Sequence, residues 1–351
     1  MRYRLLVSTG VLAVVVAVVA LGAGPVAGQT PSSGAKAYSP VRTADGHPDI
    51  SGVWSHNAAT PFERPKELEG RATLTDAELA ALKRNAAKLF NGDTDAAFGD
   101  SVFLAALKES KDFKSTDTQT GNYNHFWLVD REFDNRTSLI VDPPDGRLPP
   151  LLPEAQKRQT EAAEYNKAHY ADGPENVPHN CYGGSLPILG AGYNNYYQIA
   201  QSANSVGILM EMMHDVRVVP VDGRAALDPT IQMRLGSSRG RWDGDTLVVE
   251  TTNFKDNLRG GGAGGRGTTA TTKLTEKFTR ISATTLKYEV TVNDPSRFNK
   301  PWTAVLYWKA EPKSQIYEFA CHEGNEAMAG TLSGYRAQQK EAAEAAKKGS
   351  R

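Results

Sequence analysis

The sequence predicts a mainly antiparallel β protein that is barrel-like and carries helical insertions in its N-terminal half. In the second half of the chain, short apolar or alternating runs recur at roughly ten-residue spacing between turn residues, as in a barrel or sandwich. In the first half, two segments combine helical periodicity with capping residues. The chain of 351 residues is long enough to bury a large core.

Residues 1–28 have the layout of a secretory signal peptide, since two arginines precede a long run of Leu, Val and Ala. Val26 and Gly28 stand just before a plausible cleavage point. An uncleaved membrane anchor is the alternative, because the apolar run is nearly long enough to span a bilayer. We expect cleavage, and therefore a periplasmic or secreted protein without a membrane contact.

The charge balance does not suggest a polyanionic partner. The chain has 40 basic and 40 acidic residues, and cleavage would remove Arg2 and Arg4, leaving 38 basic residues and a net charge of −2. Nucleic-acid binding needs a clustered basic face. We therefore expect a small-molecule ligand and no nucleic acid, and we leave the oligomeric state open.

The mature chain divides into one folded domain and two flanking segments. Behind the cleavage point the sequence is polar and rich in Pro, Ser and Gly, which predicts a disordered linker. The C-terminal end is expected to be a polar helix or a frayed tail, because it has little apolar face. The expected boundaries are 29–47 for the linker, 48–336 for a single β-rich domain and 337–351 for the tail.

The helical insertions are expected at about residues 75–110 and 153–170. Thr75 and Glu78 have the spacing of a capping box ahead of an apolar helical stripe, and a second, weaker helix follows. Pro153 suits the first turn of the later helix.

The other elements are expected to be strands, including a hairpin that turns at Asp243-Gly244-Asp245. The runs predicted as strands are 50–55, 125–130, 137–142, 194–201, 205–224 (two or three strands), 240–254, 272–282, 284–294, 302–310 and 315–321.

One face of the run 272–282 carries Leu274, Glu276, Phe278 and Arg280, because side chains alternate along a strand. Charged and apolar groups on one face fit a barrel with a partly polar interior that holds a ligand. Solvent-exposed charges on an outer face are the alternative.

Several motifs are excluded. The stretch "LRGGGAGGRGTT" lacks the Gly-Lys-Ser/Thr of a phosphate-binding loop and predicts a mobile hairpin loop. No pair of histidines has zinc-protease spacing, and no nucleophile elbow is present. No cofactor is predicted, although His125, His214, His322 and a carboxylate could hold a divalent metal if the strand ends converge.

Acid–base chemistry is the favoured hypothesis for the site. His214, Asp215 and Arg217 lie at one predicted strand end, and His322 and Glu323 lie at another. Histidine titrates near neutral pH, and a neighbouring carboxylate can orient it. Either histidine would be the base, either carboxylate its partner, and Arg217 the clamp for a substrate anion.

A ligand pocket would be lined by hydroxyl, amide and imidazole groups. The candidate ligand-binding residues are Tyr193, Asn194, Asn195, Tyr196, Tyr197 and His125.

The two cysteines, Cys181 and Cys321, could form a disulfide in an oxidising compartment, with two separate buried thiols as the alternative. In a structural interpretation of "CHEGN", Cys321 anchors the strand end, and His322 and Glu323 cap a turn.

The motifs "PDISGVW", "RTSLIVDPPDGR", "SRGRWDGDTLVVETTNF" and "YEFACHEGN" resemble a large family of exported proteins of soil bacteria, over residues 48–336. The resemblance implies secretion and one domain, with no assigned chemistry. The "SGVW" segment is also similar to the Gly-x-Trp start of lipocalin-like barrels, which implies a calycin-like fold.

These observations favour an exported lyase, hydrolase or isomerase that acts by acid–base chemistry on a small aromatic or glycosidic molecule. The alternative is a β-barrel that binds a small molecule without catalysis.

Overall fold

The computed structural model describes residues 38–90, 100–109, 130–168, 186–189, 193–256, 267–321, 323–324 and 326–349. Internal contacts divide the chain into two compact units, Met1–Ser39 and Pro40–Arg351, and the β-rich fold belongs to the second. The predicted signal peptide lies outside the described residues. Among the described helices, none is long and apolar enough to cross a bilayer.

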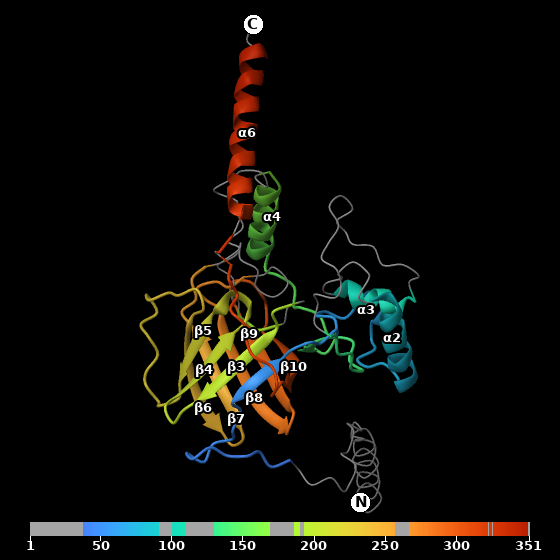
Figure 1. The fold of residues 1–351 in the computed structure, drawn as a ribbon, viewed down its shortest axis with the longest axis vertical. Coiled ribbons are helices and arrows are strands. Elements are labelled where there is room, and N and C mark those ends of the chain that lie inside the picture. The colour runs from blue at the N-terminus through green and yellow to red at the C-terminus, as the bar shows by residue number, and fades with distance from the viewer. Residues whose placement is uncertain are drawn as a thin grey trace, which may run out of the picture. The chain divides into compact units, whose positions relative to one another are not determined.

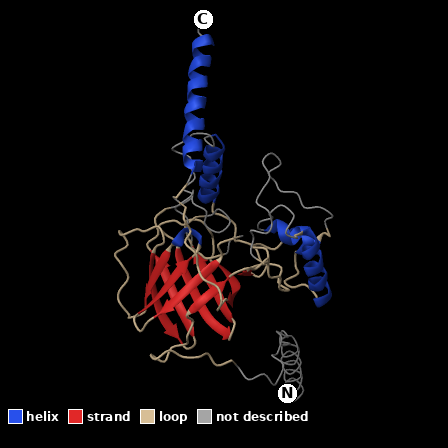
Figure 2. Cartoon of the chain, viewed as in Figure 1, coloured by secondary structure: helices blue, strands red, loops and turns tan. Residues whose placement is uncertain are grey.

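The second unit is built on a ten-stranded antiparallel sheet that curls into a nearly closed barrel (Figures 1 and 2). Nine strands follow the order β5-β4-β3-β1-β10-β9-β8-β7-β6, and β2 pairs with β10 beside this path. The predicted fold class is therefore confirmed. The strands are β1 (Gly52–Ser55), β2 (Ile140–Asp142), β3 (Tyr196–Gln201), β4 (Ser205–Met210), β5 (Val216–Pro220), β6 (Ser237–Asp243), β7 (Thr246–Thr252), β8 (Lys273–Ser282), β9 (Thr285–Asn293) and β10 (Trp302–Ala310).

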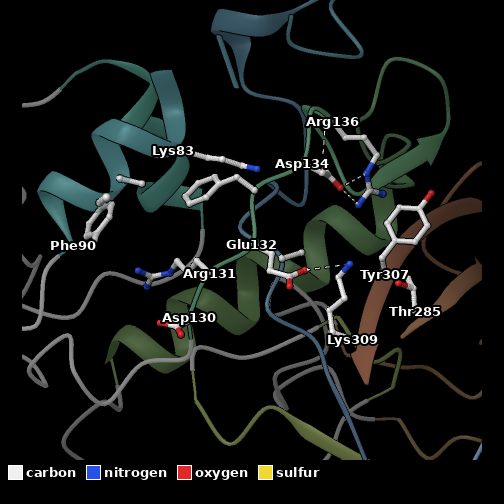
Figure 3. Close-up of a pocket in the computed structure, with 14 residues that line it drawn as sticks. Lys83, Phe90, Asp130, Arg131, Glu132, Asp134, Arg136, Thr285, Tyr307 and Lys309 are labelled. Atoms are coloured by element: carbon white, nitrogen blue, oxygen red, sulfur yellow. Dashed lines mark hydrogen bonds and ion pairs between the residues drawn. The ribbon is translucent and has the colours of Figure 1, made fainter. Parts of the chain in front are cut away.

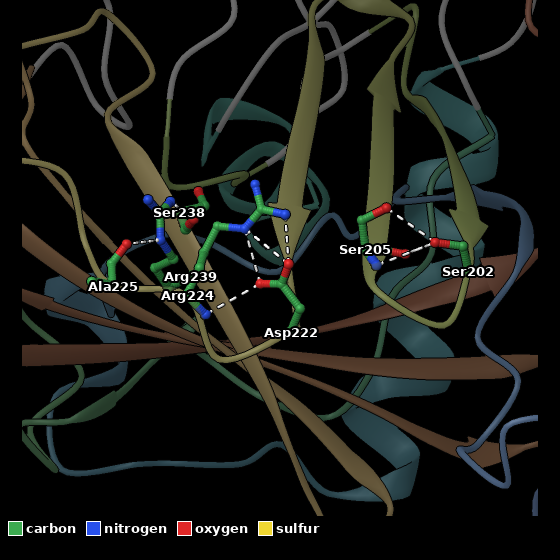
Figure 4. Close-up of polar contacts among 7 residues, drawn as sticks. All are labelled: Ser202, Ser205, Asp222, Arg224, Ala225, Ser238 and Arg239. Atoms are coloured by element: carbon green, nitrogen blue, oxygen red, sulfur yellow. Dashed lines mark hydrogen bonds and ion pairs between the residues drawn. The ribbon is translucent and has the colours of Figure 1, made fainter.

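The barrel closes where the end strands β5 and β6 meet. Each of the nine strands along the path is antiparallel to the next, so the first and the last, β5 and β6, run in the same direction. No ladder of hydrogen bonds joins these two described strands. The approach is close, because a Cβ atom at Gly240 would lie 2.8 Å from Val221 Cγ1 and 2.9 Å from Val219 Cγ1. Arg239 ties the connecting chain to β6 through a 2.8 Å bond from its Nε to the carbonyl of Ala225 (Figure 4).

The predicted mixed face of β8 points into the barrel, where Leu274, Glu276 and Phe278 are fully buried. Aromatic rings fill the space around them. Trp308 stacks on Tyr197 with ring centroids 4.7 Å apart, and Tyr288 lies 5.1 Å from Trp308 and 5.0 Å from Phe278. The polar groups of this interior are thus enclosed by packed side chains.

The helices predicted at 75–110 and 153–170 are confirmed. The capping box forms as expected, with Glu78 N–H donating to Thr75 Oγ1 at 3.3 Å and Thr75 N–H donating to Glu78 Oε2 at 2.8 Å. The first two helices lie side by side over a small second core (Figure 1). The helices are η1 (Lys66–Leu68), α2 (Asp76–Leu89), α3 (Asp100–Leu107), α4 (Pro153–Ala168), η3 (Met212–His214) and α6 (Glu326–Gly349).

Two expectations differ from the structure. Residues 315–321 are not a strand, because β10 is already paired with β1 and β9 and leaves no edge, and Tyr317 is 75% exposed. The expected disordered linker 29–47 is ordered from Pro40, where Arg42 bridges to Pro48. The C-terminal end, for which the sequence left a polar helix and a frayed tail open, is part of the helix Glu326–Gly349.

Most of the expected strand 125–130 and of the glycine-rich stretch lies outside the described residues.

Candidate functional site

The structure brings two predicted motifs together at one end of the barrel. After β4, the turn η3 leads into β5, and His214 Nδ1 lies 3.0 Å from the carbonyl oxygen of Phe319. Phe319 belongs to the motif "YEFACHEGN". A carbonyl oxygen only accepts, so Nδ1 carries the proton and Nε2 is left as the acceptor. The His214 side chain is exposed, and in this tautomer Nε2 is the nitrogen that can take a proton.

The turn that presents His214 has an uncommon backbone. Met213 and His214 have φ values of 64° and 48°, in the left-handed region that non-glycine residues rarely adopt. Hydrogen bonds hold this conformation, with His214 N–H donating to Glu211 O at 3.1 Å and Met210 N–H donating to Asp215 O at 2.9 Å. Such strained residues persist where the surroundings enforce them, and they cluster at functional sites.

Glu211 is the residue in this turn that sequence reasoning missed. Its side chain is buried and accepts from Tyr196 N–H at 3.2 Å. Burial raises the pKa of Glu211 above its usual value, although hydrogen bonds from Tyr196 and Asn194 act in the other direction. Its position could have identified it, because Glu211 is a carboxylate at a strand end, and Asp215 was selected for the same reason.

Asp215 and Arg217 have partners of their own. The carboxylate of Asp215 pairs with Arg234, with Nη1 to Oδ2 at 3.0 Å. The sequence predicts that a carboxylate orients His214. In the structure the partner of His214 Nδ1 is the Phe319 carbonyl instead.

Arg217 points into the barrel and binds Glu276 in a bidentate pair, with distances of 3.0 Å and 2.5 Å. Tyr288 OH also donates to Glu276 Oε1 at 2.8 Å. Arg217 is 4% exposed and Glu276 is 0% exposed. The structure thus gives Arg217 an internal carboxylate partner in place of the predicted substrate anion.

The predicted ligand-binding tyrosines and asparagines separate into two groups. Asn195 and Tyr197 are buried, and Tyr197 OH donates to Asn195 Oδ1 at 3.3 Å, so both belong to the core. Burial raises the pKa of Tyr197. Asn194 and Tyr196 lie beside Glu211, and Tyr193 is half-buried.

Other predicted residues remain untested. Glu323 lies in an exposed turn. His125, His322 and Cys181 lie outside the described residues, so the convergence of the histidines and the pairing of Cys181 with Cys321 stay predictions. Within the described part of the chain, no group of three metal-ligating side chains is found.

His56 is a second polar residue that the sequence did not single out. It is 2% exposed, and its Nδ1 atom has no hydrogen-bond partner. Burial lowers its pKa from 6.5 to about 4, with a further contribution from the charge of Arg136. His56 is therefore a neutral core histidine at ordinary pH.

Comparisons with protein-family models, with curated proteins and with solved structures found no match.

Proposed function

We propose that the protein is an exported enzyme that uses His214 as a general base on a small aromatic or glycosidic molecule, in a lyase, hydrolase or isomerase reaction. The observation that carries the proposal is the 3.0 Å bond between His214 Nδ1 and the Phe319 carbonyl, made by an exposed imidazole in a strained turn. These features orient one ring nitrogen toward the protein and leave the other for a substrate.

The chemistry follows from the tautomer. His214 Nε2 accepts a proton from a C–H or O–H group of the substrate, and the ring becomes an imidazolium ion. The Phe319 carbonyl stabilises the positive ring through its Nδ1–H bond. The ion then returns the proton to the leaving group or product. His322 and Glu323 belong to the proposal as further groups contributed by the segment that contains Phe319.

The export signal and a disulfide complete the proposal. In an oxidising compartment, a bridge from Cys321 to Cys181 would tether the segment that contacts His214. Support for this part comes from the predicted signal peptide and from the position of Cys321 two residues after Phe319.

A second candidate is ligand binding without catalysis. The pairing of Asp215 with Arg234 favours it, because a carboxylate engaged by arginine is a poor orienting partner for His214. In that case a ligand would be retained after loss of His214.

The test is a turnover screen of the mature chain, residues 29–351, against small aromatic and glycosidic substrates. His214→Ala should abolish turnover of any substrate found and leave the fold intact, whereas His47→Ala, at a histidine stacked on Trp242, should not. Unchanged turnover in His214→Ala would refute the assignment.

A further inference from the structure

A charged cleft of about 750 Å³ lies outside the barrel interior, between α2, residues 130–136 and strands β9 and β10 (Figure 3). Its lining combines four basic, three acidic and three aromatic side chains with small residues. A volume of this size suits a small organic ligand. The cleft is separate from the turn that carries His214, which does not line it.

Backbone pairing holds the two walls of the cleft together. Leu74 N–H, just before α2, donates to Asn135 O at 2.7 Å, and Thr137 N–H donates to Ala72 O at 3.1 Å. Arg136 then joins this segment to the barrel through a 2.6 Å bond from Nη1 to the carbonyl of Val305. The cleft is therefore a built feature of the fold, with side chains on both walls held by hydrogen-bonded backbone.

The basic groups of the cleft differ in how far the protein neutralises them. Arg136 donates from Nε to Asp134 Oδ2 at 2.7 Å and lies over the ring of Tyr307 at 4.8 Å. Lys309 is only loosely paired, with Nζ 4.0 Å from a carboxylate oxygen of Glu132. A bound anion could compete for this ammonium group at little cost.

Lys83 and Arg131 supply the other positive charges. Lys83 is an exposed residue of α2 that extends toward the cleft (Figure 3). Arg131 lies 5.3 Å from the ring centre of Phe90, and burial lowers its pKa to about 10.

The charged and aromatic side chains of the lining indicate the class of ligand. The cleft has four basic and three acidic side chains, so its formal charge is +1 and it favours an anion of low charge. The rings of Phe90, Phe133 and Tyr307 and the arginine planes offer stacking surfaces for a flat apolar body. We infer that this cleft is a second ligand site, which binds an aromatic monocarboxylate between Lys83, Arg131 and Lys309.

The test is isothermal titration calorimetry of the mature chain with benzoate as the probe. Benzamide keeps the ring and loses the charge, and acetate keeps the charge and loses the ring. Saturable benzoate binding that is at least tenfold tighter than that of either analogue, and that weakens with added salt, is expected. Equal affinity for benzoate and benzamide, or no binding of benzoate at millimolar concentration, would overturn the inference.

Two variants locate the site. Lys83→Ala and Lys309→Ala should each weaken benzoate binding about tenfold, the loss expected for one charge-assisted hydrogen bond. Lys277→Ala, on the exposed pair with Glu289, and His214→Ala should bind benzoate as the parent chain does. If both cleft variants bind benzoate as tightly as the parent chain, benzoate binds outside the cleft and the inference is wrong. Because turnover is not measured, the result is independent of the proposed catalytic role of His214.

Discussion

Arg217 and His214 are three residues apart, yet they lie in opposite environments. Arg217 is sealed inside the barrel with Glu276 and Tyr288, where every partner is a core side chain. His214 is exposed at the barrel end, in a left-handed turn, with one ring nitrogen bonded to a distant carbonyl. The pleat of β5 turns the Arg217 side chain inward, where it is structural, whereas a strained turn presents the His214 side chain to solvent, where we propose that it acts as a base.

The largest expected effect is on the interior pair. Glu276→Gln leaves Arg217 buried without a compensating charge, which should lower the free energy of unfolding by about 3–5 kcal/mol. Urea denaturation measures the loss. The surface carboxylate in Glu289→Gln is the control, and its loss should cost less than about 1 kcal/mol.

Replacing both partners sharpens this prediction. The double variant Arg217→Met/Glu276→Leu removes both charges, and should be far less destabilised than Glu276→Gln alone. If the double variant is as unstable as the single one, packing and not charge compensation explains the interior cluster.

The next effect concerns acid stability. The folded pKa of His56, about 4, lies below its ordinary 6.5, so the unfolded chain binds more protons between these values. The stabilisation that neutral, buried His56 allows should therefore be fully present above about pH 6.5. As the pH drops toward 4, the free energy of unfolding should fall by about 3 kcal/mol in total.

His56→Gln should flatten this part of the curve of unfolding free energy against pH. His47→Gln should retain the full slope. A parent chain that is equally stable at pH 4 and pH 7 would contradict the buried, neutral state of His56.

A smaller loss of stability is expected where the end strands β5 and β6 meet. In Gly240→Ala the new methyl group must displace Val219 and Val221, which should cost about 1–3 kcal/mol. Gly207→Ala is the matched strand control, because its nearest neighbour would be Ala200 O at 3.9 Å. Thermal unfolding compares the two, and equal midpoints would contradict the close approach of β5 and β6.

The smallest stability effect is expected at the barrel end. His214→Gly removes the strain of the left-handed backbone but also removes the hydrogen bond to Phe319. Because these effects oppose each other, the free energy of unfolding should change by less than about 1 kcal/mol. A loss of several kcal/mol would mean that His214 is part of the core framework.

The sequence predicted what depends on local periodicity. Alternation in β8 identified the face that points into the barrel, and Thr75 with Glu78 identified the start of α2, because these signals need no knowledge of a distant partner. The site was predicted only in part. Both motifs were selected, but the groups that bind His214 and Arg217 were not identified.

The missing information is tertiary. The carbonyl that orients His214 lies 105 residues away in the chain, and the carboxylate that binds Arg217 lies 59 residues away. Residue type shows that histidine and arginine need partners, but many carbonyls and carboxylates compete for that role. The failed strand at 315–321 has the same origin, since β10, the strand before it, is already paired with β1 on one side and β9 on the other.

The most direct test of the central claim is a long-range ¹H–¹⁵N correlation spectrum of the histidine rings at a pH where His214 is neutral, assigned with His214→Ala. We expect that His214 carries its proton on Nδ1 and has an unprotonated Nε2, because Nδ1 donates to the Phe319 carbonyl. A His214 ring protonated on Nε2 would contradict the contact and remove the proposed base.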